Sequence, residues 1–171
     1  EGMKVLVNGA SGGVGTYAVQ IARILGADVT AVCSRKNHAL VKKLGAQKVI
    51  DYKKKNFTDT SKKYDIILDA AGNLKFRDIR QNLKKDGVLI KLNLSFSNLL
   101  LQLRTRFFGR KKLRLMLMKI NKEDIKWVRD QIAIGNIRVL IDKKFSLEKA
   151  RSAHEYSETR RARGKIILKV K

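Results

Sequence analysis

A glycine-rich stretch near the start of the chain is the first feature that could do chemistry. Residues 9–15 read Gly-Ala-Ser-Gly-Gly-Val-Gly, after a short apolar run at 5–7 and before apolar residues with helical spacing. Glycines at a strand-to-helix turn let backbone N–H groups approach a phosphate, and the helix N-terminus adds partial positive charge. The stretch therefore predicts a pyrophosphate-binding loop made of Ala10, Ser11, Gly12, Gly13, Val14 and Gly15.

The loop departs at one position from the G-x-G-x-x-G pattern of dinucleotide-binding loops. When it is aligned on Gly12 and Gly15, Ala10 replaces the first glycine. Alanine can make this tight turn if its φ is negative, and the preceding Gly9 adds conformational freedom. A glycine-rich turn without a ligand is the alternative, so the surrounding elements decide how the motif is interpreted.

The end of the second expected strand bears on which dinucleotide fits. A site for NAD commonly places an acidic side chain there, about 20 residues beyond the loop, to hold the ribose 2′-OH. This chain has Cys33-Ser34-Arg35-Lys36 instead, so a hydroxyl and two cations are available to bind a 2′-phosphate. We predict NADP(H) as the cofactor; the alternative is that Arg35 and Lys36 are two of many surface cations.

Strand and helix patterns alternate through residues 1–92. Strands are expected at 4–8, 28–33, 48–51, 64–70 and 88–92, and helices at 14–25, 37–44 and 74–83. Strands that are apolar without alternation are typical of a parallel sheet covered on both faces. The predicted fold class is α/β, a doubly wound parallel (Rossmann) sheet with helices on both faces and a short C-terminal α/β appendage.

The alternation is expected to break after Leu92. Residues 94–108 have helical apolar spacing, 113–120 are compatible with a strand and 121–134 with a helix. A strand, a helix and a strand are expected at 138–145, 146–157 and 165–170. We predict a dinucleotide-binding domain at 1–135, with 94–120 as an apolar and basic insertion and edge strand, and a separate segment at 136–171.

The chain resembles the medium-chain dehydrogenase/reductases, and among them the zinc-independent quinone oxidoreductases of the ζ-crystallin type. The resemblance rests on VLVNGASGGVG at 5–15, QIA at 20–22, LGA at 44–46, VIDY at 49–52, YDIILD at 64–69, IDKKFSLEKA at 141–150 and RGKIIL at 163–168. It covers nearly the whole chain and is weakest at 94–119.

This resemblance implies hydride transfer from NADPH to a small quinone, enone or related carbonyl acceptor. It places Ser34, Arg35 and Tyr52 around the 2′-phosphate and adenosine, although Tyr52 could equally be a half-exposed aromatic at a strand end. It places Ala71, Gly72 and Asn93 toward the nicotinamide. It also implies an N-terminal catalytic domain as a partner, of which 136–171 is a returning segment. That domain is absent here, so we expect cofactor binding with little or no turnover.

Other catalytic chemistry finds little support in the sequence. Cys33, His38 and His154 lie far apart and lack the spacing of zinc ligands, so we predict no metal site. Cys33 is expected to be a buried strand residue, although nearby cations could give it some thiolate reactivity. Asp69 is expected to cap the turn after its strand, and we assign no catalytic residue. A single cysteine and the lack of a long apolar stretch favour a cytoplasmic location.

The charge of the chain is extreme, with a formal net value of +24. Such a charge attracts polyanions, but lysines spread over solvated faces are the favoured explanation. The segment 94–120 combines apolar and basic residues, and we favour a homodimer interface there. The alternatives are a helix on an anionic membrane and a local cover over the absent domain. A basic cofactor-binding module that docks on a membrane or on RNA is the alternative function. RNA is not favoured, because aromatic residues make up only 6% of the chain.

Overall fold

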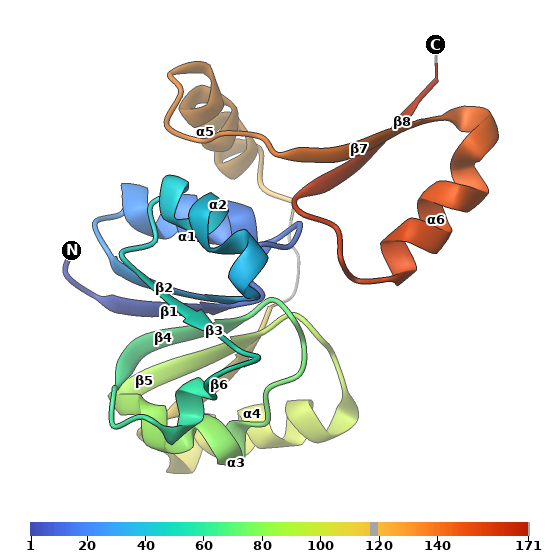
Figure 1. Ribbon diagram of the computed structural model, residues 1–171. Helices are drawn as coiled ribbons and strands as arrows, with labels where there is room; N and C mark the ends of the chain where they lie inside the picture. Colours follow the sequence, from blue (N-terminus) through green and yellow to red (C-terminus); the bar gives the residue numbers. More distant parts are fainter. Residues whose placement is uncertain (117–119, 171) are drawn as a thin grey trace.

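The computed structural model describes residues 1–116 and 120–170. Its centre is a parallel sheet in the order β3-β2-β1-β4-β5-β6 (Figure 1). The strands are β1 (Lys4–Asn8), β2 (Asp28–Cys33), β3 (Lys48–Asp51), β4 (Tyr64–Asp69), β5 (Leu83–Lys91) and β6 (Lys112–Leu115). This is the strand order of a Rossmann fold, so the predicted fold class is confirmed.

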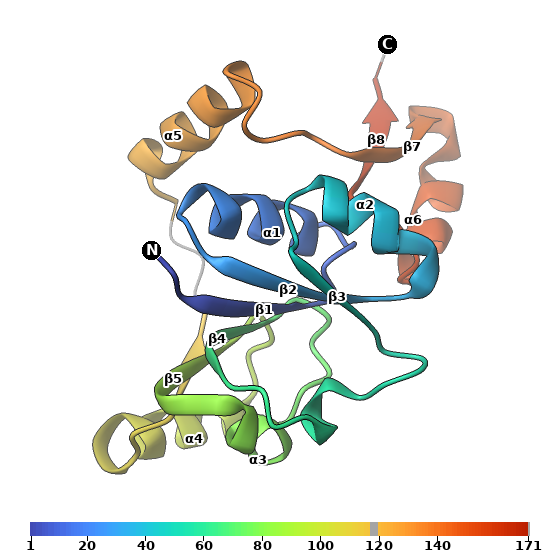
Figure 2. The ribbon, with the colours of Figure 1, turned by 60° about the vertical axis from the view of Figure 1, so that its left-hand side comes forward.

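Helices cover both faces of the sheet (Figures 1 and 2). On one face lie α1 (Gly15–Ile24) and α2 (His38–Lys43), and on the other lie α3 (Phe76–Ile79) and α4 (Phe96–Phe108). Successive side chains of a strand point to opposite faces, and β1 shows the result. Val5 and Val7 belong to the core beneath α1, whereas Leu6 belongs to the core beneath α3. Both faces of β1 are therefore buried, as its unbroken apolar run predicts.

The helix expected at 94–108 and the edge strand expected within 94–120 are present as α4 and β6. The expected break in the alternation after Leu92 is wrong, because α4 and β6 continue the sheet as one more parallel unit. The side chains of Thr105 and Gln102 in α4 also accept hydrogen bonds from the backbone of β6. The Leu113 amide donates to Thr105 Oγ1 at 3.2 Å, and the Leu115 amide donates to Gln102 Oε1 at 2.6 Å. The strand expected at 113–120 ends at Leu115, and residues 117–119 of that expectation lie outside the described residues.

The region before β5 also differs from expectation. The helix expected at 74–83 is only α3, followed by a 3₁₀ turn at Arg80–Asn82. Strand β5 begins at Leu83, five residues before the expected start at 88, because Leu83 is buried and pairs with Tyr64 across a shift in register. The polar residues between Leu83 and Gly87 hide this first part of the strand from a hydrophobicity pattern.

The C-terminal part forms a separate small layer beside the sheet (Figure 1). It contains α5 (Lys122–Ala133), β7 (Ile141–Ser146), α6 (Ala150–Glu158) and β8 (Lys165–Lys169), and β7 pairs with β8 in parallel. Strand β7 starts three residues later than expected, and α6 follows a 3₁₀ turn at Leu147–Lys149. None of the helices in the described residues is long and apolar enough to cross a membrane. The proposed domain boundary at residue 135 stays a prediction.

Three hydrogen bonds join this C-terminal part to α1, one of them from the Arg23 side chain to the Asn136 carbonyl at 3.0 Å. The Gln20 side chain donates to the Arg138 carbonyl at 3.1 Å and accepts from the Arg138 amide at 2.7 Å. Within the C-terminal part, Asp142 accepts from Tyr156 at 2.7 Å and from the Arg163 amide at 3.0 Å. Burial raises the pKa of the Asp142 carboxyl, but these hydrogen bonds and the Arg163 charge outweigh burial and leave its pKa below the usual value. Asp142 thus fastens α6 to β7.

Candidate nucleotide-binding site

The glycine loop connects the end of β1 at Asn8 to the start of α1 at Gly15. Gly9 has a φ of +78°, the left-handed region that favours glycine. Ala10 is not among the described residues with positive φ, so alanine makes the turn as expected. The amides of Gly9 and Ala10 both donate to the Val32 carbonyl at 3.1 Å, which ties the loop to the end of β2.

Gly15 and Gly12 are needed for different reasons. A Cβ on Gly15 would overlap the Gly9 carbonyl oxygen and lie 2.7 Å from the Ala10 Cα, so only glycine lets α1 start this close to β1. A Cβ on Gly12 would meet nothing nearer than the Gly9 carbonyl oxygen, at 3.4 Å. Packing therefore requires glycine at 15, whereas glycine at 12 leaves open space beside the loop, as close approach of a phosphate demands.

A buried amide links the loop to the end of β2. Asn37, only 5% exposed, donates through Nδ2 to Ser11 Oγ at 2.9 Å and to Ser34 Oγ at 3.4 Å. A serine hydroxyl that accepts a hydrogen bond keeps its own O–H to donate elsewhere. Two hydroxyl donors are thus oriented side by side, with the exposed cation of Arg35 next in the chain. This arrangement suits a phosphate.

A second network shapes the turn after β4. The side chain of Asp69 is fully buried, and its carboxylate accepts from the amides of Gly72 and Leu74, each at 2.9 Å. Asn8 of β1 donates to the same carboxylate at 2.9 Å, and Lys91 of β5 lies 4.0 Å from it. The expectation that Asp69 caps this turn is confirmed, and the carboxylate also connects three adjacent strands.

The sheet brings the candidate residues to one edge, because the carboxyl ends of parallel strands meet there. Ala71 packs on the glycine loop, since a Cβ on Gly9 would lie 2.9 Å from the Ala71 amide nitrogen. Asn93 follows β5 and donates to the Gly72 carbonyl at 3.4 Å. Tyr52 follows β3, whose last residue pairs with the last residue of β2, and it is 57% exposed. No hydrogen bond within the described residues joins Tyr52 to the other candidates, so its role stays a prediction.

Sequence reasoning missed three contributors to this edge. Asn37 and Asn73 act through amides, and Asn73 accepts from the Asn8 side chain at 2.7 Å. Lys165 belongs to β8, yet a Cβ on Gly13 would lie only 3.5 Å from its Nζ. The Gly164 amide donates to the Ser11 carbonyl at 3.2 Å, which anchors that strand on the loop. Only the fold brings a lysine so far along the chain to the glycine loop.

Cys33 lies at the end of β2 and is 2% exposed. Burial, and secondarily the charge of Asp51, raises the pKa of its thiol to about 11. The thiol therefore stays protonated near neutral pH, and the thiolate reactivity considered from the neighbouring cations has no support. Cys33 is a core residue, as its apolar surroundings in the sequence indicate.

The geometry defines a dinucleotide-binding Rossmann domain, and comparison with known proteins places it more narrowly. Residues 44–168 match the family model for zinc-binding dehydrogenases. A chloroplastic quinone-oxidoreductase of Triphysaria versicolor is 36% identical over 169 residues, covering 96% of this chain and 51% of that protein. A mitochondrial NAD(P)H oxidoreductase of Bos taurus is 53% identical over 74 residues, covering 42% of this chain and 19% of that protein. The chain belongs to the medium-chain dehydrogenase/reductase family.

A solved structure agrees with this assignment. The quinone oxidoreductase of Coxiella burnetii superposes with a TM-score of 0.90 at 28% identity, covering 100% of this chain and 54% of that one. The chain spans about half the length of the curated relatives that it matches along its whole length. It corresponds to their cofactor-binding part, and the activity of a longer protein is a matter of proposal.

The matching family model is described as that of zinc-binding dehydrogenases, but the side chains that the structure describes do not form a zinc site. Within residues 1–116 and 120–170, no three His, Cys, Asp or Glu side chains gather in a way that could hold an ion. The one cysteine keeps its proton, whereas zinc binds the thiolate. A nicotinamide dinucleotide fits far better, because the loop at Gly12 is open and two serine hydroxyls and a cation stand beside it.

Proposed function

We propose that this chain is the NADPH-binding part of an oxidoreductase that passes a hydride to a quinone, an enone or a related carbonyl acceptor. The observation that carries the proposal is the contact of Asn37 with Ser11 and Ser34, at 2.9 and 3.4 Å. It joins the glycine loop to the strand end where a dinucleotide's ribose is expected. Arg35 lies beside this strand end, and residues 33–36 include no acidic side chain. The end of β2 therefore favours a 2′-phosphate.

The chain's own residues bind and orient the cofactor in this proposal. The loop amides and the start of α1 attract the pyrophosphate, and the turn held by Asp69 supports the nicotinamide side through Ala71 and Gly72. Bound nicotinamide supplies the hydride, while the protein sets its position and excludes competing reactions. We assign no proton-transferring residue, and we propose little or no turnover for the chain alone.

Several finer points rest on the relatives and belong to the proposal. The matched Triphysaria protein is called a quinone-oxidoreductase, which supports the acceptor class. We propose a zinc-independent member, on the resemblance of the sequence to the zinc-independent quinone oxidoreductases. The relatives include chloroplastic and mitochondrial proteins, so the cytoplasmic location expected from a single cysteine stays a prediction.

The cofactor preference is tested by Arg35→Ala. Removing a charge-assisted contact to the 2′-phosphate should weaken NADPH binding about tenfold and leave NADH binding within about twofold. Fluorescence titration of both nucleotides measures the two affinities. Lys42→Ala is the matched control, because Lys42 is an exposed cation of α2. Equal affinities for both nucleotides, in the wild type as in the Arg35 variant, would contradict NADP preference.

We also propose a homodimer through 94–120, formed by the outer face of α4. Phe107 and Phe108 are 72% and 90% exposed, and such aromatic side chains are usually covered in a soluble protein. The amides of β6 toward α4 are already bonded to Thr105 and Gln102, so the helix face is a better contact than the strand edge.

The dimer is tested by sedimentation equilibrium. Phe107→Ser with Phe108→Ser should convert a dimer to a monomer, because two large apolar contacts are lost. Leu25→Ser with Ile134→Ser is the control, since these side chains are exposed elsewhere. A monomeric wild type rules the dimer out, and flotation with anionic vesicles then tests the membrane alternative.

A further inference from the structure

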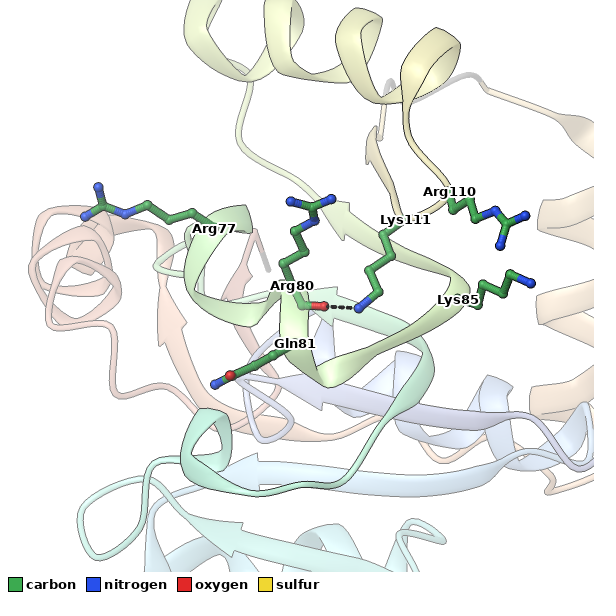
Figure 3. Close-up of a pocket in the computed structure, with 6 residues that line it drawn as sticks. All are labelled: Arg77, Arg80, Gln81, Lys85, Arg110 and Lys111. Atoms are coloured by element: carbon green, nitrogen blue, oxygen red, sulfur yellow. Dashed lines mark hydrogen bonds between the residues drawn. The ribbon is translucent and has the colours of Figure 1, made fainter.

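A cavity of about 480 Å³ lies far from the glycine loop. It is lined by Arg77, Arg80, Gln81, Lys85, Arg110 and Lys111 (Figure 3). These residues come from the segment before β5, the start of β5 and the segment before β6. They therefore lie at the amino ends of the parallel strands, whereas the nucleotide site lies at the carboxyl ends. The cavity is a separate site.

The lining is almost entirely cationic. Five of its six side chains are arginine or lysine, and none is a carboxylate. Arg77 pairs with Asp78 at 3.0 Å. Within residues 1–116 and 120–170, the other four cations have no carboxylate oxygen within 4.0 Å. Gathering like charges costs free energy, and a bound anion would lower that cost.

Two contacts hold the wall in shape. The Lys111 ammonium donates to the Arg80 carbonyl at 2.7 Å, which bridges the segments before β5 and β6 (Figure 3). The Gln81 side chain donates to the Thr58 carbonyl at 2.9 Å. Burial, and then the charges of Lys63 and Arg80, lower the pKa of Lys111. Lys63 and Arg80 thus add positive charge near this ammonium, which a bound anion would offset.

We propose that this cavity binds a small polyphosphate anion, a chain of two or three phosphates. A phosphate carries roughly one to two negative charges near neutral pH, so two or three of them balance the four lining cations that have no carboxylate partner. Guanidinium groups form bidentate hydrogen bonds with phosphate oxygens. The volume lies within the usual range for small-ligand sites, about 300–1,000 Å³. No lining residue is aromatic, so the phosphates are recognised rather than a nucleobase.

The test is calorimetric titration of the chain with tripolyphosphate at 0.15 M salt. The pocket variant is Arg80→Ala, Lys85→Ala and Arg110→Ala, all exposed side chains, with Lys111 kept because it bridges two segments. The variant should bind tripolyphosphate at least about tenfold more weakly. The control variant Lys42→Ala, Lys43→Ala and Lys126→Ala removes the same charge from other exposed positions and should stay within about twofold. Lys85→Glu alone is a second, milder pocket variant that should also weaken binding.

Two further titrations test whether the ligand is a free polyphosphate or a nucleotide, and whether binding occurs at this cavity or at the proposed NADPH site. Adenosine triphosphate should bind as tightly as tripolyphosphate, because the lining has no aromatic side chain on which the base could stack. Arg35→Ala should leave tripolyphosphate binding unchanged, so the result does not depend on the proposed NADPH site. Equal losses in the pocket and control variants would overturn the proposal, as would tripolyphosphate binding no tighter than sulfate. Binding of an RNA oligonucleotide without binding of tripolyphosphate would overturn it too.

Discussion

Gly15→Ala should push the start of α1 away from the sheet and greatly weaken NADPH binding. The new Cβ would overlap the Gly9 carbonyl oxygen and lie 2.7 Å from the Ala10 Cα. Both are backbone atoms of residues whose amides donate to the Val32 carbonyl, so neither residue can move cheaply. The overlap should cost about 1–3 kcal/mol of the free energy of unfolding. Displacing the helix end by about 1 Å should lower NADPH affinity by on the order of a hundredfold.

Gly12→Ala is the matched variant, and its expected result differs. Its Cβ meets only the Gly9 carbonyl oxygen, at an ordinary contact distance of 3.4 Å, so urea denaturation should give nearly the wild-type stability. The same methyl group would occupy the open space beside the loop, so NADPH affinity should still fall at least about tenfold. If Gly12→Ala binds NADPH as the wild type does, the pyrophosphate does not lie against this loop.

The sequence predicts most of this end of the sheet because its signals are local. The strand, glycine loop and helix occupy consecutive residues, so their order alone indicates the turn that Gly9 and Ala10 make. The strand ends at Ser34, Tyr52 and Asn93 follow from the same reasoning, since parallel strands place their carboxyl ends together. Local pattern and tertiary structure agree here because the apolar runs are buried on both faces.

The features that the sequence does not predict depend on distant contacts. The sequence is compatible with a strand at 113–120, but it predicts neither the end of β6 at Leu115 nor its parallel pairing with β5, because β6 is only four residues long and alternates lysine and arginine with leucine. What makes it a strand is pairing with β5 and the side chains of Thr105 and Gln102. Asn37 likewise looks like a surface residue until α2 and the loop bury it. The cationic cavity unites Arg77 with Arg110, which no local pattern connects.

Asp69 should matter more to stability than any other carboxylate of the site. It is fully buried, and its oxygens accept three hydrogen bonds at 2.9 Å, from Asn8, Gly72 and Leu74. Lys91 is also buried and lies 4.0 Å away, with its ammonium donating to the Leu74 carbonyl at 2.5 Å. Replacing Asp69 by asparagine leaves the Lys91 ammonium without a nearby counter-charge. The backbone amides of Gly72 and Leu74 then face a neutral side-chain amide in place of a carboxylate. Removing one partner of a buried ion pair typically costs about 3–5 kcal/mol.

Asp69→Asn should therefore lower the free energy of unfolding by about 3 kcal/mol, measured by urea denaturation. Asp78→Asn is the control, because its exposed ion pair with Arg77 should contribute less than about 1 kcal/mol. Adding Lys91→Met to Asp69→Asn should recover part of the loss, since the uncompensated cation is removed. A loss that Lys91→Met leaves unchanged would mean that the hydrogen bonds to Gly72 and Leu74, rather than the buried charge, account for the effect. A fully stable Asp69→Asn would refute the role of this carboxylate in holding the turn, and with it the support that Ala71 and Gly72 give to the nicotinamide side.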